Sequence, residues 1–247
     1  MNFASELSEA ILLKRYDRIL VDVAVSKKEI RTIYCPNNGL LRGCDSLGSR
    51  VWFSTSLNPK RKHPDVWEIV EIEGGHLVLV NNLRSHDLLI EAFEQNLIAE
   101  LIGYDEILKN HLLDKSNIVV DLALRNFNSN ENCYVMVEQV TMGDEIHRGF
   151  FPDAPHTPAL KELNDLIDLK IKGHRAILFF LVQHTGIDRV FPADHVDKQY
   201  GLLLREAIKV GIELCAYRVA ISLKTLKIDK AIEIIIPKKM PLYSKPI

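Results

Sequence analysis

The hydrophobic period of the chain changes near residue 85, and this change limits the folds that the chain can adopt. Between residues 15 and 80, five short segments rich in β-branched and aromatic residues are separated by turn signals such as PNNG and EGG. From Ser85, a residue type that often caps helices, apolar residues recur at helical spacing. Helix and strand patterns then alternate. We therefore expect two different architectures in succession.

The two parts predict an α+β chain with two domains, residues 1–84 and residues 85–247. Five short strands in about 70 residues suggest a small closed barrel, most simply an OB-fold, with a small β-sandwich as the alternative. The second part is typical of an α/β layer with a mixed sheet. Its predicted helices are 85–101, 157–173 and 197–211, and its predicted strands are 117–127, 132–142, 174–184 and 212–222.

Composition gives no sign of a membrane or secreted protein. The chain has 247 residues and a net charge of -2, and it contains no run of 18 apolar residues. Its four cysteines have unrelated spacings, so we expect reduced thiols and a cytoplasmic location. The histidines also lack a metal-ligand spacing, and we expect those in the second domain to be surface or hydrogen-bonded residues: His147, His156, His174, His184 and His195.

The segment NCYVMVEQVTM, residues 132–142, raises the question of function. In a strand, Met136 and Glu138 point to one face and Val135 and Val137 to the other. The second face is apolar and belongs against a core. The first carries a thioether followed by a carboxylate. It fits a plain half-buried strand with one solvated acid, or a metal-dependent active-site strand that has lost part of its ligands.

Several longer segments resemble the sugar fermentation stimulation protein (SfsA) family. They are CPNNGLLRGCDSLGSRVWFSTSLNPKRKHPDVWEIVE, RYDRILVDV, FPDA at 151–154 and PADHVDKQYGLLLREAIKVGIELCAY. The resemblance covers roughly residues 3–220. It implies an N-terminal OB-fold and a C-terminal domain of the PD-(D/E)xK nuclease type. It also implies DNA binding and an association with the regulation of maltose and other sugar metabolism.

The resemblance also implies a damaged nuclease site. In such domains an Asp and a Glu on adjacent strands hold Mg²⁺, and a Lys two residues after the Glu stabilises charge. Asp121 aligns with the Asp if the following loop has one extra residue, but Met136 replaces the Glu and Glu138 replaces the Lys. Glu91 matches the acid of the first helix, and Lys161 is retained after FPDA.

A thioether is a poor ligand for Mg²⁺, so the sequence favours an inactive site and leaves open whether the chain is an enzyme. No cofactor is expected to be required. Mg²⁺ is the ion expected if a rearranged set of Glu91, Asp121 and Glu138 still binds metal.

Basic residues cluster in the predicted barrel. An OB-fold binds nucleic acid with a positive groove and stacking aromatic rings. The alternative is a solvated turn and aromatic core residues. The candidate phosphate contacts are Lys14, Arg15, Arg18, Arg42, Arg50, Lys60, Arg61 and Lys62, and the nearby aromatic residues are Tyr34, Trp52, Phe53 and Trp67.

Three functional hypotheses follow from the sequence. The first is a DNA-binding regulatory protein with an inactive nuclease-like domain. The second is a metal-dependent DNA nuclease with an altered site. The third is an interaction protein that uses the fold as a scaffold and has neither activity. DNA is the expected partner in the first two, and no membrane partner is expected.

Overall fold

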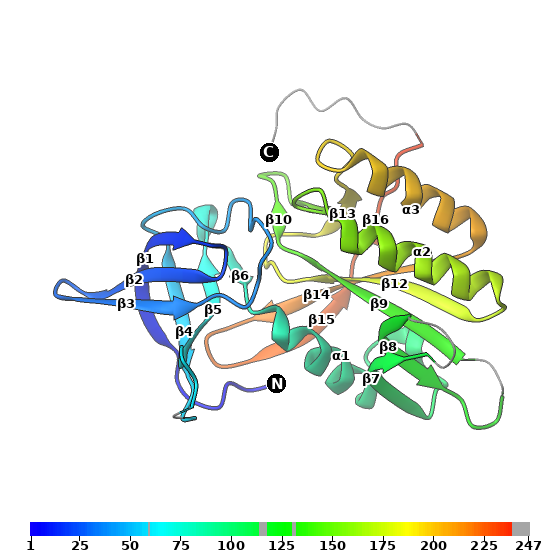
Figure 1. Ribbon diagram of the computed structural model, residues 1–247, viewed down its shortest axis with the longest axis horizontal. Helices are drawn as coiled ribbons and strands as arrows, with labels where there is room; N and C mark the ends of the chain where they lie inside the picture. The colour runs from blue at the N-terminus through cyan, green and yellow to red at the C-terminus, as the bar shows by residue number, and fades with distance from the viewer. Residues whose placement is uncertain (59, 114–117, 130–131, 239–247) are drawn as a thin grey trace.

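A computed structural model describes residues 1–58, 60–113, 118–129 and 132–238 and contains two domains joined side by side (Figure 1). The N-terminal domain is a barrel of antiparallel strands in the order β3-β2-β1-β4-β5-β6, closed by a pairing between β3 and β5. Its strands are β1 (Ser8–Tyr16), β2 (Leu20–Ser26), β3 (Glu29–Tyr34), β4 (Arg50–Thr55), β5 (Asp65–Glu71) and β6 (Leu77–Leu79). The barrel predicted from the sequence is confirmed.

The first barrel strand was missed in the sequence. The predicted strands began near residue 16, whereas β1 starts at Ser8 and pairs with both β2 and β4. Ala10 and Leu12 are buried in alternation, but β1 carries four consecutive apolar residues, 10–13, which hide the strand period in the sequence. Tertiary pairing, rather than a local period, makes this segment a strand.

The C-terminal domain is built on a mixed sheet in the order β15-β14-β12-β9-β8-β7. β12 lies parallel to β9 and β14, and the two edge pairs are antiparallel. The strands are β7 (Glu106–Leu112), β8 (Val119–Arg125), β9 (Asn132–Val140), β12 (Arg175–Val182), β14 (Glu213–Ile221) and β15 (Leu226–Ala231). A smaller sheet contains β10 (Met142–Gly143), β11 (Arg148–Phe151), β13 (Arg189–Pro192) and β16 (Glu233–Ile234).

Helices cover both faces of the large sheet. α2 (Thr157–Ile171) and α3 (Lys198–Val210) lie on one face, and α1 (Ser85–Glu94) packs on the other (Figure 1). The described part of the chain also contains three short 3₁₀ helices, Glu73–Gly75, Asn82–Arg84 and Ala99–Leu101. Ser85 is not the cap that the sequence suggested, because Arg84 holds that position and the Ser85 hydroxyl accepts a hydrogen bond from Gln183 instead.

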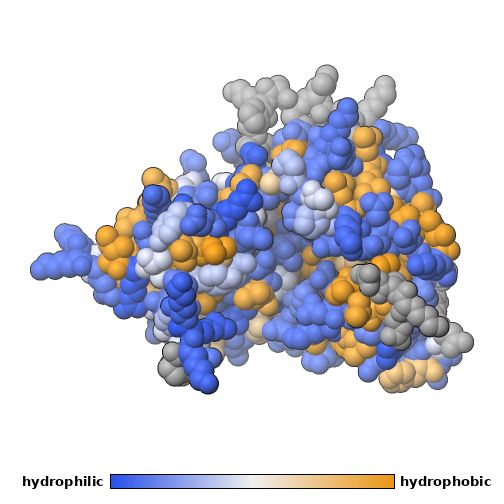
Figure 2. Space-filling model, in the orientation of Figure 1, coloured by the Kyte–Doolittle hydropathy of each residue, from blue (hydrophilic) through white to orange (hydrophobic). Residues whose placement is uncertain are grey.

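The two domains share a hydrophobic core. Trp52 and Ile69 of the barrel belong to the same buried cluster as Leu88 of α1 and Val137 of β9. Strand β6 continues this contact through backbone hydrogen bonds to residues 183 and 185 beyond β12. Figure 2 shows a largely hydrophilic surface with separate apolar patches on both domains. None of the helices among the described residues is both long and apolar enough to cross a membrane.

Candidate carboxylate site and basic surface

A cavity of about 750 Å³ lies where the barrel meets the C-terminal domain. The barrel contributes Arg18 and the loop at residues 37–39, and α1 contributes His86. The C-terminal domain places three carboxyl groups on its sheet and on α2, from Asp121 on β8, Glu138 on β9 and Glu162 on α2, and Asp87 of α1 and Asp153 also line the cavity. Side chains separated by up to 144 residues therefore meet in one space, and two of them, Asp121 and Glu138, are candidate site residues from the sequence.

Asp121 is held from two sides. Its Oδ2 accepts a hydrogen bond from the backbone N–H of Val137 at 2.7 Å, and its Oδ1 lies 3.1 Å from Nε2 of His86. β8 and β9 pair only as far as Leu122 and Val135, so the strands have separated at Asp121. The Asp121 carboxylate therefore accepts the N–H of Val137, which in a continuous sheet would donate to a backbone carbonyl of β8.

Glu138 is a buried acid rather than the solvated acid that one interpretation of the strand expected. Its side chain is only 5% exposed, because α2 covers this face of β9. Its Oε1 has no hydrogen-bond partner in the structure. Loss of solvent, with the nearby charges of Glu162 and Asp121, raises the pKa of Glu138 well above its ordinary value. This carboxyl therefore holds a proton more strongly than a surface glutamate.

Glu162 is a site residue that the sequence analysis missed. It lies on α2 three residues after buried Ala159 and four before buried Leu166, so it belongs to the inward-facing stripe of the helix. Burial, followed by the charge of Asp121, raises the pKa of Glu162 to about 7. An acid on an otherwise apolar helical stripe is the sequence signal that could have identified it.

Three of the predicted site residues do not reach the cavity. Met136 is 1% exposed and packs in the core with α2 and α3. Glu91 pairs with the N-terminal amino group of Met1 at 2.5 Å and does not line this cavity, so its role as a metal ligand stays a prediction. Lys161 is exposed and pairs with Asp165 one turn further along α2. Helical rotation thus directs Glu162, not Lys161, toward the sheet.

The described residues contain no group of three or more His, Cys, Asp or Glu side chains that could hold a metal ion as they stand. Asp121, Glu138 and Glu162 offer the oxygen ligands that Mg²⁺ prefers, but Asp121 is engaged with His86 and β9. The arrangement therefore fits a proton-neutralised carboxyl cluster better than a preformed metal centre.

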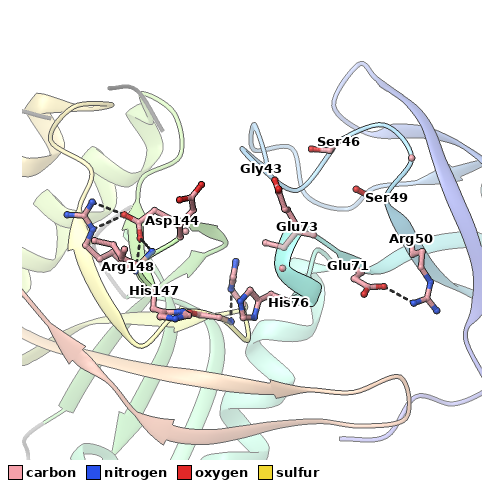
Figure 3. A pocket seen from close by; sticks show the side chains of 18 of the residues that line it. Gly43, Ser46, Ser49, Arg50, Glu71, Glu73, His76, Asp144, His147 and Arg148 are labelled. Atoms are coloured by element: carbon pink, nitrogen blue, oxygen red, sulfur yellow. Dashed lines mark hydrogen bonds and ion pairs between the residues drawn. The ribbon is translucent and has the colours of Figure 1, made fainter. Parts of the chain in front are cut away.

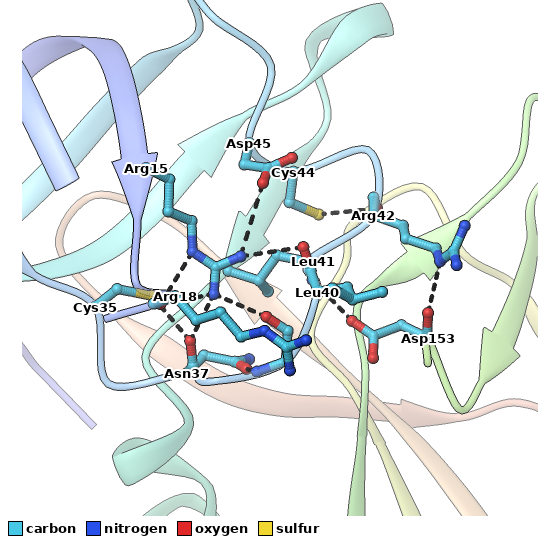
Figure 4. A network of polar contacts seen from close by, with 11 residues as sticks. Arg15, Arg18, Cys35, Asn37, Leu40, Leu41, Arg42, Cys44, Asp45 and Asp153 are labelled. Atoms are coloured by element: carbon cyan, nitrogen blue, oxygen red, sulfur yellow. Dashed lines mark hydrogen bonds and ion pairs between the residues drawn. The ribbon is translucent and has the colours of Figure 1, made fainter. Parts of the chain in front are cut away.

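The loop after β3 connects the barrel to this cavity, and Arg15 holds its shape (Figure 4). The Arg15 guanidinium donates hydrogen bonds to the carbonyl oxygens of Arg18, Asn37, Gly39 and Leu40 at 2.8–3.1 Å. Its side chain is only 6% exposed. Arg15 therefore holds the loop in shape, and its role as a phosphate contact stays a prediction.

The same loop binds the C-terminal domain through Asp153. The Asp153 carboxylate accepts a hydrogen bond from the Leu41 backbone N–H at 2.8 Å, and its carbonyl accepts one from Arg42 Nε at 2.6 Å. Arg42 therefore fastens the two domains together at the edge of the cavity (Figure 4).

The remaining predicted phosphate contacts divide into paired and available cations. Arg50 forms ion pairs with Glu9 and Glu71. Five exposed residues have no side-chain ion pair among the described parts of the chain: Lys14, Arg18, Lys60, Arg61 and Lys62. Figure 2 shows strongly hydrophilic side chains around the lower tip of the barrel, where the loop between β4 and β5 lies in Figure 1.

The barrel aromatic residues are core residues. Trp67 and Phe53 are fully buried, and Trp52 is 3% exposed and lies against the C-terminal domain. Tyr34 alone among the four predicted candidates is partly exposed. Base stacking on these side chains is therefore excluded for Trp52, Phe53 and Trp67, and any nucleic-acid contact of the barrel must depend mainly on its cations.

Comparison with known families supports the two-domain division. Residues 13–80 match the family model described as the SfsA N-terminal OB domain. Residues 83–225 match the family model described as the sugar fermentation stimulation protein RE domain. The chain belongs to the SfsA family. It is similar to the sugar fermentation stimulation protein homologues of Aliivibrio fischeri, with 42% identity over 92% of this chain and 97% of that protein, and of Aeromonas hydrophila, with 41% identity over 92% of both.

A solved SfsA structure has the same fold. It is described as Pyrococcus furiosus SfsA in complex with Ca²⁺, and it superposes with a TM-score of 0.84 over 96% of this chain and 98% of that one. The two sequences are 20% identical, so this likeness concerns the fold alone. Within the SfsA fold, the present chain places a buried methionine and a buried acid, Met136 and Glu138, on the strand that borders the cavity.

Proposed function

We propose that this SfsA-family protein binds DNA through phosphate contacts of its barrel and does not hydrolyse it. The observation that carries the proposal is the loop between β4 and β5, where Lys60, Arg61 and Lys62 are exposed and without an ion pair among the described residues. Three adjacent uncompensated cations attract a phosphate backbone and release its counterions. Lys14 and Arg18 extend the available charge along the barrel.

The carboxyl cavity supports binding without cleavage. Hydrolysis by this kind of domain needs a divalent ion and an activated water. Here Met136 is a core residue, Asp121 is engaged by His86, and Glu138 is buried and favours its protonated form. Protonation also removes negative charge that would otherwise repel a nearby phosphate.

The family name connects such proteins with sugar fermentation. We accordingly propose that the DNA binding serves the regulation of sugar metabolism, including maltose metabolism, and takes place in the cytoplasm. DNA binding of this kind requires no cofactor.

One assay on a mixed set of single- and double-stranded DNAs, with and without Mg²⁺ or Mn²⁺, tests the proposal. The unaltered chain should bind DNA with an affinity that falls steeply with salt, and it should leave the DNA intact. Replacing Lys60, Arg61 and Lys62 with Ala should weaken binding uniformly across sequences. It should also reduce the salt slope on duplex DNA by up to about 0.9 for each lost contact.

A matched variant controls for the loss of three charges. Lys224, Lys227 and Lys230 lie on or beside β15, far from the barrel tip in sequence, and have no ion pair among the residues described. Their replacement with Ala removes the same charge and should leave the salt slope unchanged. An unaltered affinity and slope in the barrel variant would reject the proposed surface.

A second candidate, a metal-dependent nuclease with an altered site, is favoured by one observation. Glu162 brings a third carboxyl group to Asp121 and Glu138, in a fold whose Pyrococcus furiosus relative is described in complex with Ca²⁺. Cleavage that requires Mg²⁺ or Mn²⁺ and is abolished by both Asp121→Asn and Glu162→Gln would establish this function in place of the silent cavity.

A further inference from the structure

A second and larger cavity, of about 1230 Å³, lies on another part of the junction between the domains (Figure 3). Three histidines that are distant in sequence line it. His76 follows the 3₁₀ helix Glu73–Gly75 of the barrel, His147 lies in the turn between β10 and β11, and His184 follows β12. The three histidines show no ligand spacing in the sequence, and His76 reaches the other two only because the two domains pack together.

Gly186 contacts all three imidazole rings, by two hydrogen bonds and one close approach. The Gly186 carbonyl accepts a hydrogen bond from Nδ1 of His147 at 2.8 Å, and its N–H donates to Nδ1 of His184 at 2.9 Å. A Cβ atom at Gly186 would lie 2.8 Å from ring atoms of His76, so no side chain fits there. The centre of the His76 ring lies 6.1 Å from the centre of the His147 ring and 5.8 Å from the centre of the His184 ring.

The hydrogen bonds assign different chemistry to the two anchored rings. Because Nδ1 of His147 donates a proton to a carbonyl, its Nε2 carries a free lone pair, which is the usual arrangement of a metal-binding histidine. Nδ1 of His184 accepts an N–H, so the neutral ring carries its proton on Nε2 and offers a donor there.

The backbone and the rim add two independent observations. His147 has a φ of 66°, a left-handed conformation that costs energy in a residue other than glycine and is often kept at functional positions. The rim carries Glu73 and Glu145, neither of which forms an ion pair within the described ranges. These exposed carboxylates favour a cation and stand close in sequence to His76 and His147.

We propose that His76 and His147 form a binding site for a divalent transition-metal ion, with Zn²⁺ as the probe ion, at the junction of the two domains. Two imidazoles on one zinc ion have ring centres about 5 to 6 Å apart, because each Zn–N bond is about 2.0–2.1 Å. The observed separation of 6.1 Å needs only a small ring movement. His184 serves as a hydrogen-bond donor beside the ion and not as a ligand.

The proposed metal site has open coordination positions and differs in this from a closed structural metal site. No three potential ligands among the described residues are already arranged around one point, so water or a rotated carboxylate of Glu73 or Glu145 must complete the coordination. An ion held by one imidazole from each domain would stabilise the contact between the two domains. It would also exchange readily with ions in solution. This inference is independent of the carboxylate cavity and of the proposed DNA binding.

Isothermal titration calorimetry of the full chain with ZnCl₂ tests the site. We expect one Zn²⁺ per chain, with His76→Ala and His147→Ala each weakening binding at least ~10-fold, because loss of even an outer hydrogen-bond partner of a ligand can cost that much. His63→Ala and His111→Ala remove imidazoles outside this cavity and should change nothing. Asp121→Asn should also leave Zn²⁺ binding unchanged, which separates this site from the carboxylate cavity.

A second measurement does not depend on the folding of variants. Long-range ¹H–¹⁵N spectra of the unaltered chain should show Zn²⁺ shifting the ring nitrogens of His76 and His147, while Nδ1 of His184 stays unprotonated. Absence of Zn²⁺ binding, binding that survives in the His76→Ala/His147→Ala double variant, or binding lost with Asp121→Asn would each overturn the proposal.

Discussion

Arg15 illustrates, at the scale of a single residue, that a cation in a basic segment can be entirely structural. Replacing Arg15 with Met should lower the free energy of unfolding by about 2–4 kcal/mol, because several carbonyl groups in the loop at residues 37–40 lose their charged donor. Chemical denaturation measures this change. Arg18→Met, three residues later in the exposed turn after β1, should stay within about 0.5 kcal/mol of the unaltered chain.

The pair of variants also separates stability from DNA affinity. Arg18→Met should weaken DNA binding while the fold remains stable. A normal stability for Arg15→Met would show that water replaces its hydrogen bonds and that the loop does not depend on this side chain.

At the scale of secondary-structure elements, the packing of α2 on β9 controls the charge of the carboxylate cavity. Glu162 has a pKa of about 7 in the folded chain, above the ordinary value of 4.5. Below pH 4.5 it is protonated in both the folded and unfolded states. Between 4.5 and 7 the unfolded chain loses this proton while the folded chain keeps it, so stability should fall as pH rises through this window.

Urea denaturation across pH 4–8 checks this sign. Glu162→Gln is neutral at every pH and should flatten the decline, whereas Glu94→Gln, at the exposed end of α1, should leave its slope unchanged. An equal slope in the unaltered chain and in Glu162→Gln would show that Glu162 titrates as a solvated acid.

The same elements show what the sequence could and could not predict. The barrel and the mixed sheet follow from local periods and turn residues, and Asp121 and Glu138 line one cavity. Glu162 was missed, although its place on the apolar stripe of α2 was visible in the sequence. Glu91 does not line this cavity, because the placement of α1 against the sheet results from long-range packing that the local sequence does not determine.

At the scale of the whole molecule, a buried carboxylate of the barrel holds the segment at which the chain leaves the barrel for the C-terminal domain. Glu68 of β5 is 0% exposed, and its oxygens accept hydrogen bonds from Ser54, Asn81 and Arg84. Arg84 ends the short helix that leads from the barrel into α1. The charge of Glu68 is therefore balanced by the residue at which the chain passes from one domain to the other.

Removal of Arg84 should accordingly be costly to the whole molecule. Arg84→Met leaves Glu68 buried without its counter-charge and should lower the free energy of unfolding by about 3–5 kcal/mol. The double variant Glu68→Gln/Arg84→Met removes both charges and should recover part of that loss, giving a coupling energy that a double-mutant cycle measures. If the double variant is less stable than Arg84→Met by the full effect of Glu68→Gln alone, the two side chains act independently and the junction depends on its apolar contacts instead.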